Sequence, residues 1–228
     1  VHVQSGCPEP VTSAVGGGEM SSLQSEAGAA LKSPPGGSDK KRLFVAISLP
    51  EPILKAVAEL QSELKRYARD AKWVRPEGIH LTLKFLGYVE IDRIEAISNT
   101  LTGVANVSPP LSIDVRGCGA FPNSRRPNVL WTGVESEHLG GVQTRVEEAL
   151  VELGFEKENR PFSPHLTLAR FRDPHGLTPL MLQVENRKDL PLGHFTASRL
   201  KLFESILHRQ GAEYHVLKEF LLEGTQWM

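Results

Sequence analysis

Hydrophobic and polar residues alternate most regularly in two six-residue segments, 80–85 and 165–170, which both begin with His-Leu-Thr-Leu. A strand places successive side chains on opposite faces, so the histidine and threonine of each copy share one face and the two leucines share the other. The pattern predicts two strands whose leucines anchor them to a core. The histidine and threonine then project together, roughly 7 Å apart at ~3.4 Å per residue.

The remaining apolar positions predict further strands and helices in a repeated order. The first half of the chain shows strand, helix, strand, strand and helix, and a similar series follows in the second half. Each half contains one His-Leu-Thr-Leu strand, which favours a duplicated α+β fold with two lobes facing each other. The predicted helices are 51–69, 90–104, 138–153 and 177–186, and the predicted strands are 42–49, 72–76, 78–87, 111–119, 128–134, 164–171, 195–207 and 213–222.

Residues 1–39 differ in composition from the rest, because glycine, serine and proline supply 18 of these 39 positions. Such a segment buries too little apolar surface to offset the entropy of ordering it. We predict a disordered tail over residues 1–40 and a two-lobed domain over 41–228. Met20 follows a "GGGE" run and is a candidate for the natural start of the chain.

Composition sets limits on compartment and partners. The net charge of −1 gives no sign of wholesale nucleic-acid binding, although a short ligand would need only a local basic patch. The two cysteines, Cys7 and Cys118, form no CxxC pair, which disfavours a zinc ribbon or a disulfide scaffold and favours a reducing, cytosolic setting. No apolar run is long enough for a membrane-spanning helix.

Two histidines and two threonines that converge on one cleft suit phosphate ester chemistry. Imidazole titrates near pH 6.5, so one ring can take a proton from water while the other gives a proton to a leaving oxygen. Threonine hydroxyls can donate hydrogen bonds to the phosphate oxygens. The candidate catalytic residues are therefore His80 and His165, and the candidate phosphate-binding residues are Thr82 and Thr167.

A single His-Leu-Thr-Leu strand would more often carry a structural histidine, but two copies with the same hydrophobic pattern are harder to explain in that way. A zinc site is a further alternative. Neither motif contains HxH, HExxH or a carboxylate, so we expect no metal and no cofactor.

The chain resembles the two-histidine phosphoesterase superfamily, and in particular the RNA 2′,3′-cyclic phosphodiesterases once called 2′-5′ RNA ligases. The resemblance covers residues 42–222 and rests on "RLFVAISLP", "WVRPEGIHLTLKFLG", "GCGAFPNSRRPNVLWTGV", "NRPFSPHLTLARF" and "LKLFESILHRQGAEYHVL". It implies a bilobal α+β fold in which two similar lobes, each with an antiparallel sheet and flanking helices, are related by a pseudo-two-fold axis through a central cleft.

The resemblance also implies an activity. Members open an RNA 2′,3′-cyclic phosphate to a 2′-phosphomonoester and can join tRNA halves weakly and reversibly through a 2′-5′ bond. By the match, His80 is the proton donor, His165 is the base, and Thr82 and Thr167 bind the phosphate. The expected partner is RNA, with no membrane and a monomeric state. The alternatives are an RNA-end-binding accessory module with little turnover, or a phosphoesterase for 2′,5′-linked or small cyclic nucleotides.

Two further cations lie in the motif strands. Lys84 is four residues after His80, so simple alternation places it on the same face, where it could reach a phosphate. A solvated lysine is equally compatible with the pattern. Arg170 has the opposite parity from His165, so it could reach the cleft only if the strand twists or bulges.

Other residues have weaker claims. Phe44, Phe85 and Trp131 could stack a base but suit core packing better. Arg125 and Arg126 could bind RNA backbone or simply be solvated. Four histidines outside the motifs are predicted to be surface or sheet residues: His175, His194, His208 and His215.

Overall fold

The computed structural model describes residues 39–208 and 211–225, which belong to one compact unit, Pro35–Met228. The predicted tail lies outside these residues, apart from Asp39 and Lys40, as does the proposed start at Met20.

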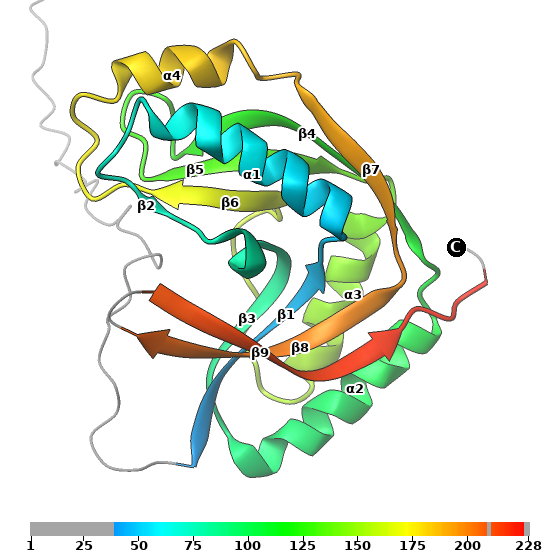
Figure 1. The fold of residues 1–228 in the computed structure, drawn as a ribbon. Helices are drawn as coiled ribbons and strands as arrows, with labels where there is room; N and C mark the ends of the chain where they lie inside the picture. Colours follow the sequence, from blue (N-terminus) through cyan, green and yellow to red (C-terminus); the bar gives the residue numbers. More distant parts are fainter. Residues whose placement is uncertain (1–38, 209–210, 226–228) are drawn as a thin grey trace, which may run out of the picture. The chain divides into compact units, whose positions relative to one another are not determined.

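The strands form two antiparallel sheets, which confirms the predicted α+β class with two lobes (Figure 1). The first sheet contains four strands in the order β3 (His80–Glu90), β1 (Lys40–Ser48), β8 (Arg199–His208) and β9 (Gly211–Leu221). The second sheet contains five strands in the order β2 (Lys72–Trp73), β6 (His165–Arg170), β5 (Val129–Glu135), β4 (Leu111–Phe121) and β7 (Pro191–Ala197).

Helices are exchanged between the two halves of the chain. Helix α1 (Glu51–Lys65) follows β1 of the first sheet but contacts β7 of the second, and α4 (Thr178–Glu185) packs against β4 of the same sheet. Helix α3 (Leu139–Val151) follows β5 of the second sheet but contacts β3 of the first, beside α2 (Ile94–Asn106). Each sheet is therefore covered by one helix from the other half. Two short 3-10 helices complete the fold, η2 (Pro76–Gly78) and η3 (Ile91–Arg93).

One predicted strand, 195–207, is in fact two. The chain leaves the second sheet after Ala197 and enters the first sheet at Arg199, so β7 and β8 belong to different lobes. The inward-facing positions change phase here: Ala197 is the buried residue of β7, whereas Leu200 and Leu202 are buried in β8. The segment is nevertheless rich in apolar residues throughout, so the sequence predicts a single strand.

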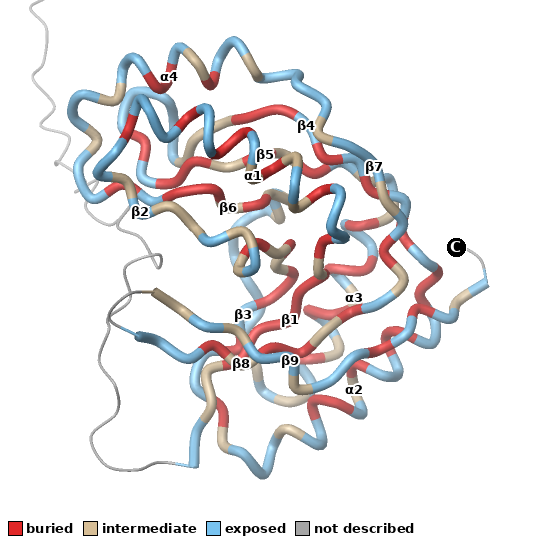
Figure 2. The backbone as a smooth tube through the Cα atoms, in the orientation of Figure 1, coloured by how far each residue is buried: buried red, intermediate tan, exposed pale blue. Residues whose placement is uncertain are grey.

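The core is continuous beneath both sheets (Figure 2). In β1 the odd-numbered residues Leu43, Val45 and Ile47 join this main core. Phe44 and Ala46 point to the opposite face, where they form a small second cluster with Phe203, packed by Tyr214. The main core holds the four motif leucines, and each fully buried leucine side chain is worth about 1.5–3 kcal/mol.

Both motif strands carry a β-bulge at the same place. In the β1–β3 pairing, Ala46 is opposite Thr82 and Val45 is opposite Lys84, so Leu83 is the extra residue. In the β5–β6 pairing, Trp131 is opposite Thr167 and Leu130 is opposite Ala169, so Leu168 is the extra residue. A bulge reverses the alternation of the residues that follow it. The six residues of the two motifs consequently share one burial pattern.

Candidate active site

The two motif strands lie where the two sheets meet. His80 is the first residue of β3, an edge strand, and His165 is the first residue of β6. Strands β3 and β6 contact each other across the two sheets. Leu81, Leu83, Leu166 and Leu168 are all at most 4% exposed, which confirms their predicted place in the core. Alternation then directs the histidines and threonines to the opposite face, which we call the motif face.

His80 is surrounded by aromatic rings of the small second cluster. Its imidazole stacks on Phe44 at 4.6 Å between centroids and meets the edge of Tyr214 at 4.9 Å, with Phe203 at 5.9 Å. Burial among these rings lowers the pKa of His80 from about 6.5 to about 4, partly opposed by a hydrogen bond with the Gly78 carbonyl. The unliganded site therefore favours a neutral ring.

His165 has a similar arrangement in the other lobe. Its Nδ1 lies 2.7 Å from the carbonyl oxygen of Ser163, and Phe121 meets the imidazole edge-on at 5.0 Å. Because a carbonyl can only accept, Nδ1 carries the hydrogen and Nε2 keeps its lone pair in the neutral ring. Burial lowers the pKa of His165; the Ser163 hydrogen bond opposes this and the charge of Arg170 adds to it.

The two histidines are thus held alike, each by the carbonyl of the residue two positions earlier. Thr82 and Thr167, two residues further along each strand, are half-buried. Each half of the chain therefore contributes an oriented imidazole and a hydroxyl to the motif face. This set can accept a proton, donate a proton and donate hydrogen bonds to an anion.

Lys84 does not lie on the motif face, and the prediction that it shares the face of His80 is wrong. The bulge at Leu83 turns it toward the core, where it is 6% exposed. Its ammonium lies 2.6 Å from a carboxylate oxygen of Glu147 in α3 and donates to the carbonyl of Glu156 at 2.8 Å. An ammonium paired in this way is not available to a phosphate.

Arg170 is placed by the other bulge. The extra residue Leu168 reverses the alternation, so Arg170 falls on the motif face, which is the condition under which the sequence allowed it to reach the cleft. Its positive charge acts on both His165 and Tyr214. Burial raises the pKa of Tyr214, which meets His80 edge-on, and the charges of Arg170 and Arg42 lower it. Arg42 also donates to Ser205 at 3.1 Å.

Sequence reasoning missed Tyr214, Phe203 and Arg42. Tyr214 and Phe203 come from the C-terminal strands β9 and β8, and the pairing of β8 with β1 brings Phe203 opposite Phe44. The only available signal was their aromatic character in predicted strands. Phe44 itself is 1% exposed, so it packs in the cluster as predicted and forms the surface beneath His80, whereas Phe85 is 60% exposed.

Of the remaining predicted positions, Trp131 is opposite Thr167, with its ring 5.2 Å from that of Phe121, whereas Arg125 and Arg126 lie in a turn. Asn123 accepts hydrogen bonds from the backbone amides of Arg125 and Arg126, and both arginines are exposed. Four histidines outside the motifs are exposed, each beside a carboxylate: His175, His194, His208 and His215. In the described part of the chain, no helix is long and apolar enough to cross a membrane.

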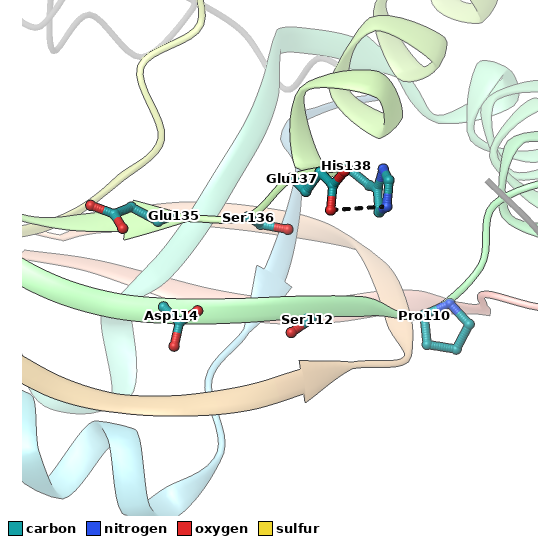
Figure 3. A pocket seen from close by; sticks show the side chains of 7 residues that line it. All are labelled: Pro110, Ser112, Asp114, Glu135, Ser136, Glu137 and His138. Atoms are coloured by element: carbon teal, nitrogen blue, oxygen red, sulfur yellow. Dashed lines mark ion pairs between the residues drawn. The ribbon is translucent and has the colours of Figure 1, made fainter. Parts of the chain in front are cut away.

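A hollow at one end of β4 and β5 does not extend this site (Figure 3). None of its residues belongs to a motif strand, and three of them are acidic, which disfavours a phosphate. It is lined by Pro110, Ser112, Asp114, Glu135, Ser136, Glu137 and His138. Among residues 39–208 and 211–225, no group of three or more histidine, cysteine or acidic side chains is arranged to hold a metal ion.

This chain is similar to known proteins along most of its length. The model of the LigT-like phosphoesterase family matches residues 47–131 and 133–214. An RNA 2′,3′-cyclic phosphodiesterase of Methanocaldococcus jannaschii is 35% identical over 179 residues, covering 78% of this chain and 99% of the relative. The Thermotoga maritima enzyme of the same name is 32% identical over 185 residues, covering 80% of this chain and 96% of the relative.

Solved structures show the same fold. A Thermus thermophilus protein superposes with a TM-score of 0.69 and 29% identity, covering 81% of this chain and 100% of that one. Escherichia coli LigT, solved with 3′-AMP, has a TM-score of 0.65 and 24% identity, covering 80% of this chain and 98% of that one.

Proposed function

This chain belongs to the LigT-like phosphoesterase family, and from that premise we propose that it hydrolyses the 2′,3′-cyclic phosphate at an RNA 3′ end to a 2′-phosphomonoester. General cyclic phosphodiesterase activity follows from relatives 32–35% identical over most of the chain. The observation that carries the finer proposal is the matched pair of motifs, each with a carbonyl-bound histidine and a threonine on the motif face.

His165 acts as the general base. Its Nδ1 is occupied by the Ser163 carbonyl, so Nε2 is the nitrogen that takes a proton from water. The water oxygen forms a bond to phosphorus as the bond from phosphorus to O3′ breaks. The leaving O3′ takes a proton from His80, and the phosphate stays on O2′. The hydroxyls of Thr82 and Thr167 and the guanidinium of Arg170 stabilise the charge on the non-bridging oxygens.

The donor role of His80 requires its imidazolium form, whereas burial favours the neutral ring. The substrate supplies the opposing effect, because a phosphate anion beside an imidazole raises its pKa. Binding of the cyclic phosphate therefore favours the protonated form of the donor. The assignment of donor and base follows the order of the motifs in the family, since the geometry treats both histidines alike.

Ligation uses the same steps with a different nucleophile. If the 5′-hydroxyl of a second RNA, such as a tRNA half, replaces water, attack at phosphorus with loss of O3′ gives a 2′-5′ bond. The reaction is reversible because it exchanges one ester for another. We propose that the enzyme works as a monomer in a reducing compartment, in keeping with the unpaired thiol of buried Cys118.

Incubation of an oligoribonucleotide ending in a 2′,3′-cyclic phosphate, followed by 31P NMR of the product, tests the proposal. A 2′-phosphomonoester is expected. A 3′-phosphomonoester would contradict the choice of leaving oxygen. Tight binding without turnover would instead support an RNA-end-binding module.

A further inference from the structure

Each motif bulge is held by a buried polar side chain from one of the exchanged helices. Glu147 of α3 is 3% exposed and binds Lys84, the residue that follows the bulge at Leu83. Gln61 of α1 is 1% exposed, and its amide donates to the carbonyl of Leu168, the bulge residue of β6, at 2.9 Å.

The two polar residues occupy equivalent places in the duplicated fold. In each helix the polar residue directly follows one buried aliphatic residue and precedes a buried leucine by three positions. Gln61 and Glu147 are 86 residues apart, and His80 and His165 are 85 apart. Each helix follows a strand of one lobe and reaches the motif strand of the other lobe.

These contacts also hold the segments next to the motifs. Gln61 donates to the carbonyl of Val74 at 2.9 Å, and the amide of Val74 donates to the carbonyl of Leu168 at 2.9 Å. Glu147 accepts from the amide of Glu158 at 3.3 Å, in the connection that leads to Ser163 and His165.

Such polar groups are costly to bury, and an apolar pair could fill the same volume. The Oε1 atom of Gln61 has no hydrogen-bond partner in the described structure, which adds to that cost. Stability alone therefore does not account for them. The bulges decide which side chains reach the motif face, so a group that fixes a bulge also fixes the approach of Thr82, Thr167 and Arg170 to a phosphate.

We infer that Gln61 and the Lys84–Glu147 pair are positioning residues that hold the two motif bulges in register and couple each motif to the half of the chain that carries the other. This inference rests on the proposed function for its kinetic consequence. Its structural consequence, the placement of the two imidazoles, is independent of turnover.

The test compares two apolar replacements with the parent: the double variant Lys84→Met/Glu147→Leu, and Gln61→Met. Ser108→Ala is the matched control, because Ser108 is fully buried and donates to Val104 at 2.8 Å outside both motifs. Three quantities are measured on each protein: kcat and KM on a cyclic-ended oligonucleotide, the urea unfolding midpoint, and the NMR titrations of His80 and His165.

We expect kcat to fall about 10- to 100-fold in both replacements, the scale of a misplaced reacting group, with a smaller change in KM. The unfolding midpoint should stay near that of the parent, the titration of the nearby histidine should shift, and Ser108→Ala should keep the parent kcat. If the double variant does not fold, Glu147→Gln, which keeps an acceptor for Lys84, takes its place.

A kcat within about twofold of the parent, with unchanged histidine titrations, would overturn the inference and leave these groups a structural role. If the parent itself does not turn over the cyclic phosphate, the proposed function fails. The NMR titrations then decide the positioning role alone: shifted titrations support it and unchanged titrations refute it.

Discussion

The imidazole of His80 stacks on the ring of Phe44, with centroids 4.6 Å apart and an interplanar angle of 29°. Phe44 lies on the neighbouring strand and is 1% exposed, so it shields one face of the imidazole from water. Burial is the main cause of the pKa of about 4 for His80, and the rings of Phe44, Tyr214 and Phe203 lie around the imidazole.

The first prediction concerns stability at acid pH. The folded chain holds His80 at a pKa of about 4, against about 6.5 when unfolded, so between these values the unfolded chain binds the extra proton. His80 therefore contributes on the order of 3 kcal/mol to the free energy of unfolding. This contribution is complete above pH 6.5 and is lost as the pH falls toward 4.

Urea unfolding of the parent and of His80→Gln across pH 4–7 measures this contribution. The parent should lose more stability than the variant as the pH falls, while carboxylate effects are common to both. Parallel curves would show that His80 is not held neutral by burial.

The second prediction concerns the threonines. Thr82→Val and Thr167→Val keep the volume and lose the hydroxyl, so each should lower kcat about 10²- to 10³-fold, as expected for one donor to a developing charge. Thr→Ser at each position is the matched control and should keep most of the rate. Full activity in both valine variants would show that these hydroxyls do not bind the phosphate.

The third prediction separates Arg170 from other cations. Arg170→Met removes a charge from the motif face and should raise KM for the cyclic-ended oligonucleotide about 10- to 100-fold, the value of a charged hydrogen bond. The control, Lys55→Met, changes an exposed lysine of α1 and should leave KM unchanged. An equal effect of both substitutions would indicate general charge attraction instead of a specific contact.

The fourth prediction concerns metal. The proposed steps need only side chains of this chain, so hydrolysis should continue in excess chelator. Loss of activity with EDTA, restored by a divalent ion, would contradict the mechanism.

The motifs and their leucines could be predicted because a single strand with one buried face shows its alternation directly. The faces on which Lys84 and Arg170 lie could not be predicted, because a bulge is a property of two paired strands. Simple alternation directs Lys84 to the motif face and Arg170 away from it, and the bulges at Leu83 and Leu168 reverse both assignments. A bulge leaves no mark in the spacing of hydrophobic residues along one segment.

The aromatic residues around His80 could not be predicted from the sequence for a different reason. Tyr214 and Phe203 reach it because the chain crosses from the second sheet to the first at Ser198 and then adds β8 and β9 beside β1. The spacing of apolar residues predicts one continuous strand where β7 and β8 are separate. The aromatic partners of the site therefore have no predicted role until the strand order is known.

The central claim is that the two His-Leu-Thr-Leu copies form one site, and a double-mutant cycle on one cyclic-ended oligonucleotide tests it most directly. Rates are measured for the parent, His80→Ala, His165→Ala and the double variant. We predict that each single variant loses about 10²- to 10⁴-fold in rate, the usual worth of one acid or base. The double variant should be far less than multiplicatively worse, because residues that act as a unit are not additive. A near-normal rate in either single variant, or losses that multiply in the double variant, would show that the two histidines do not serve one reaction.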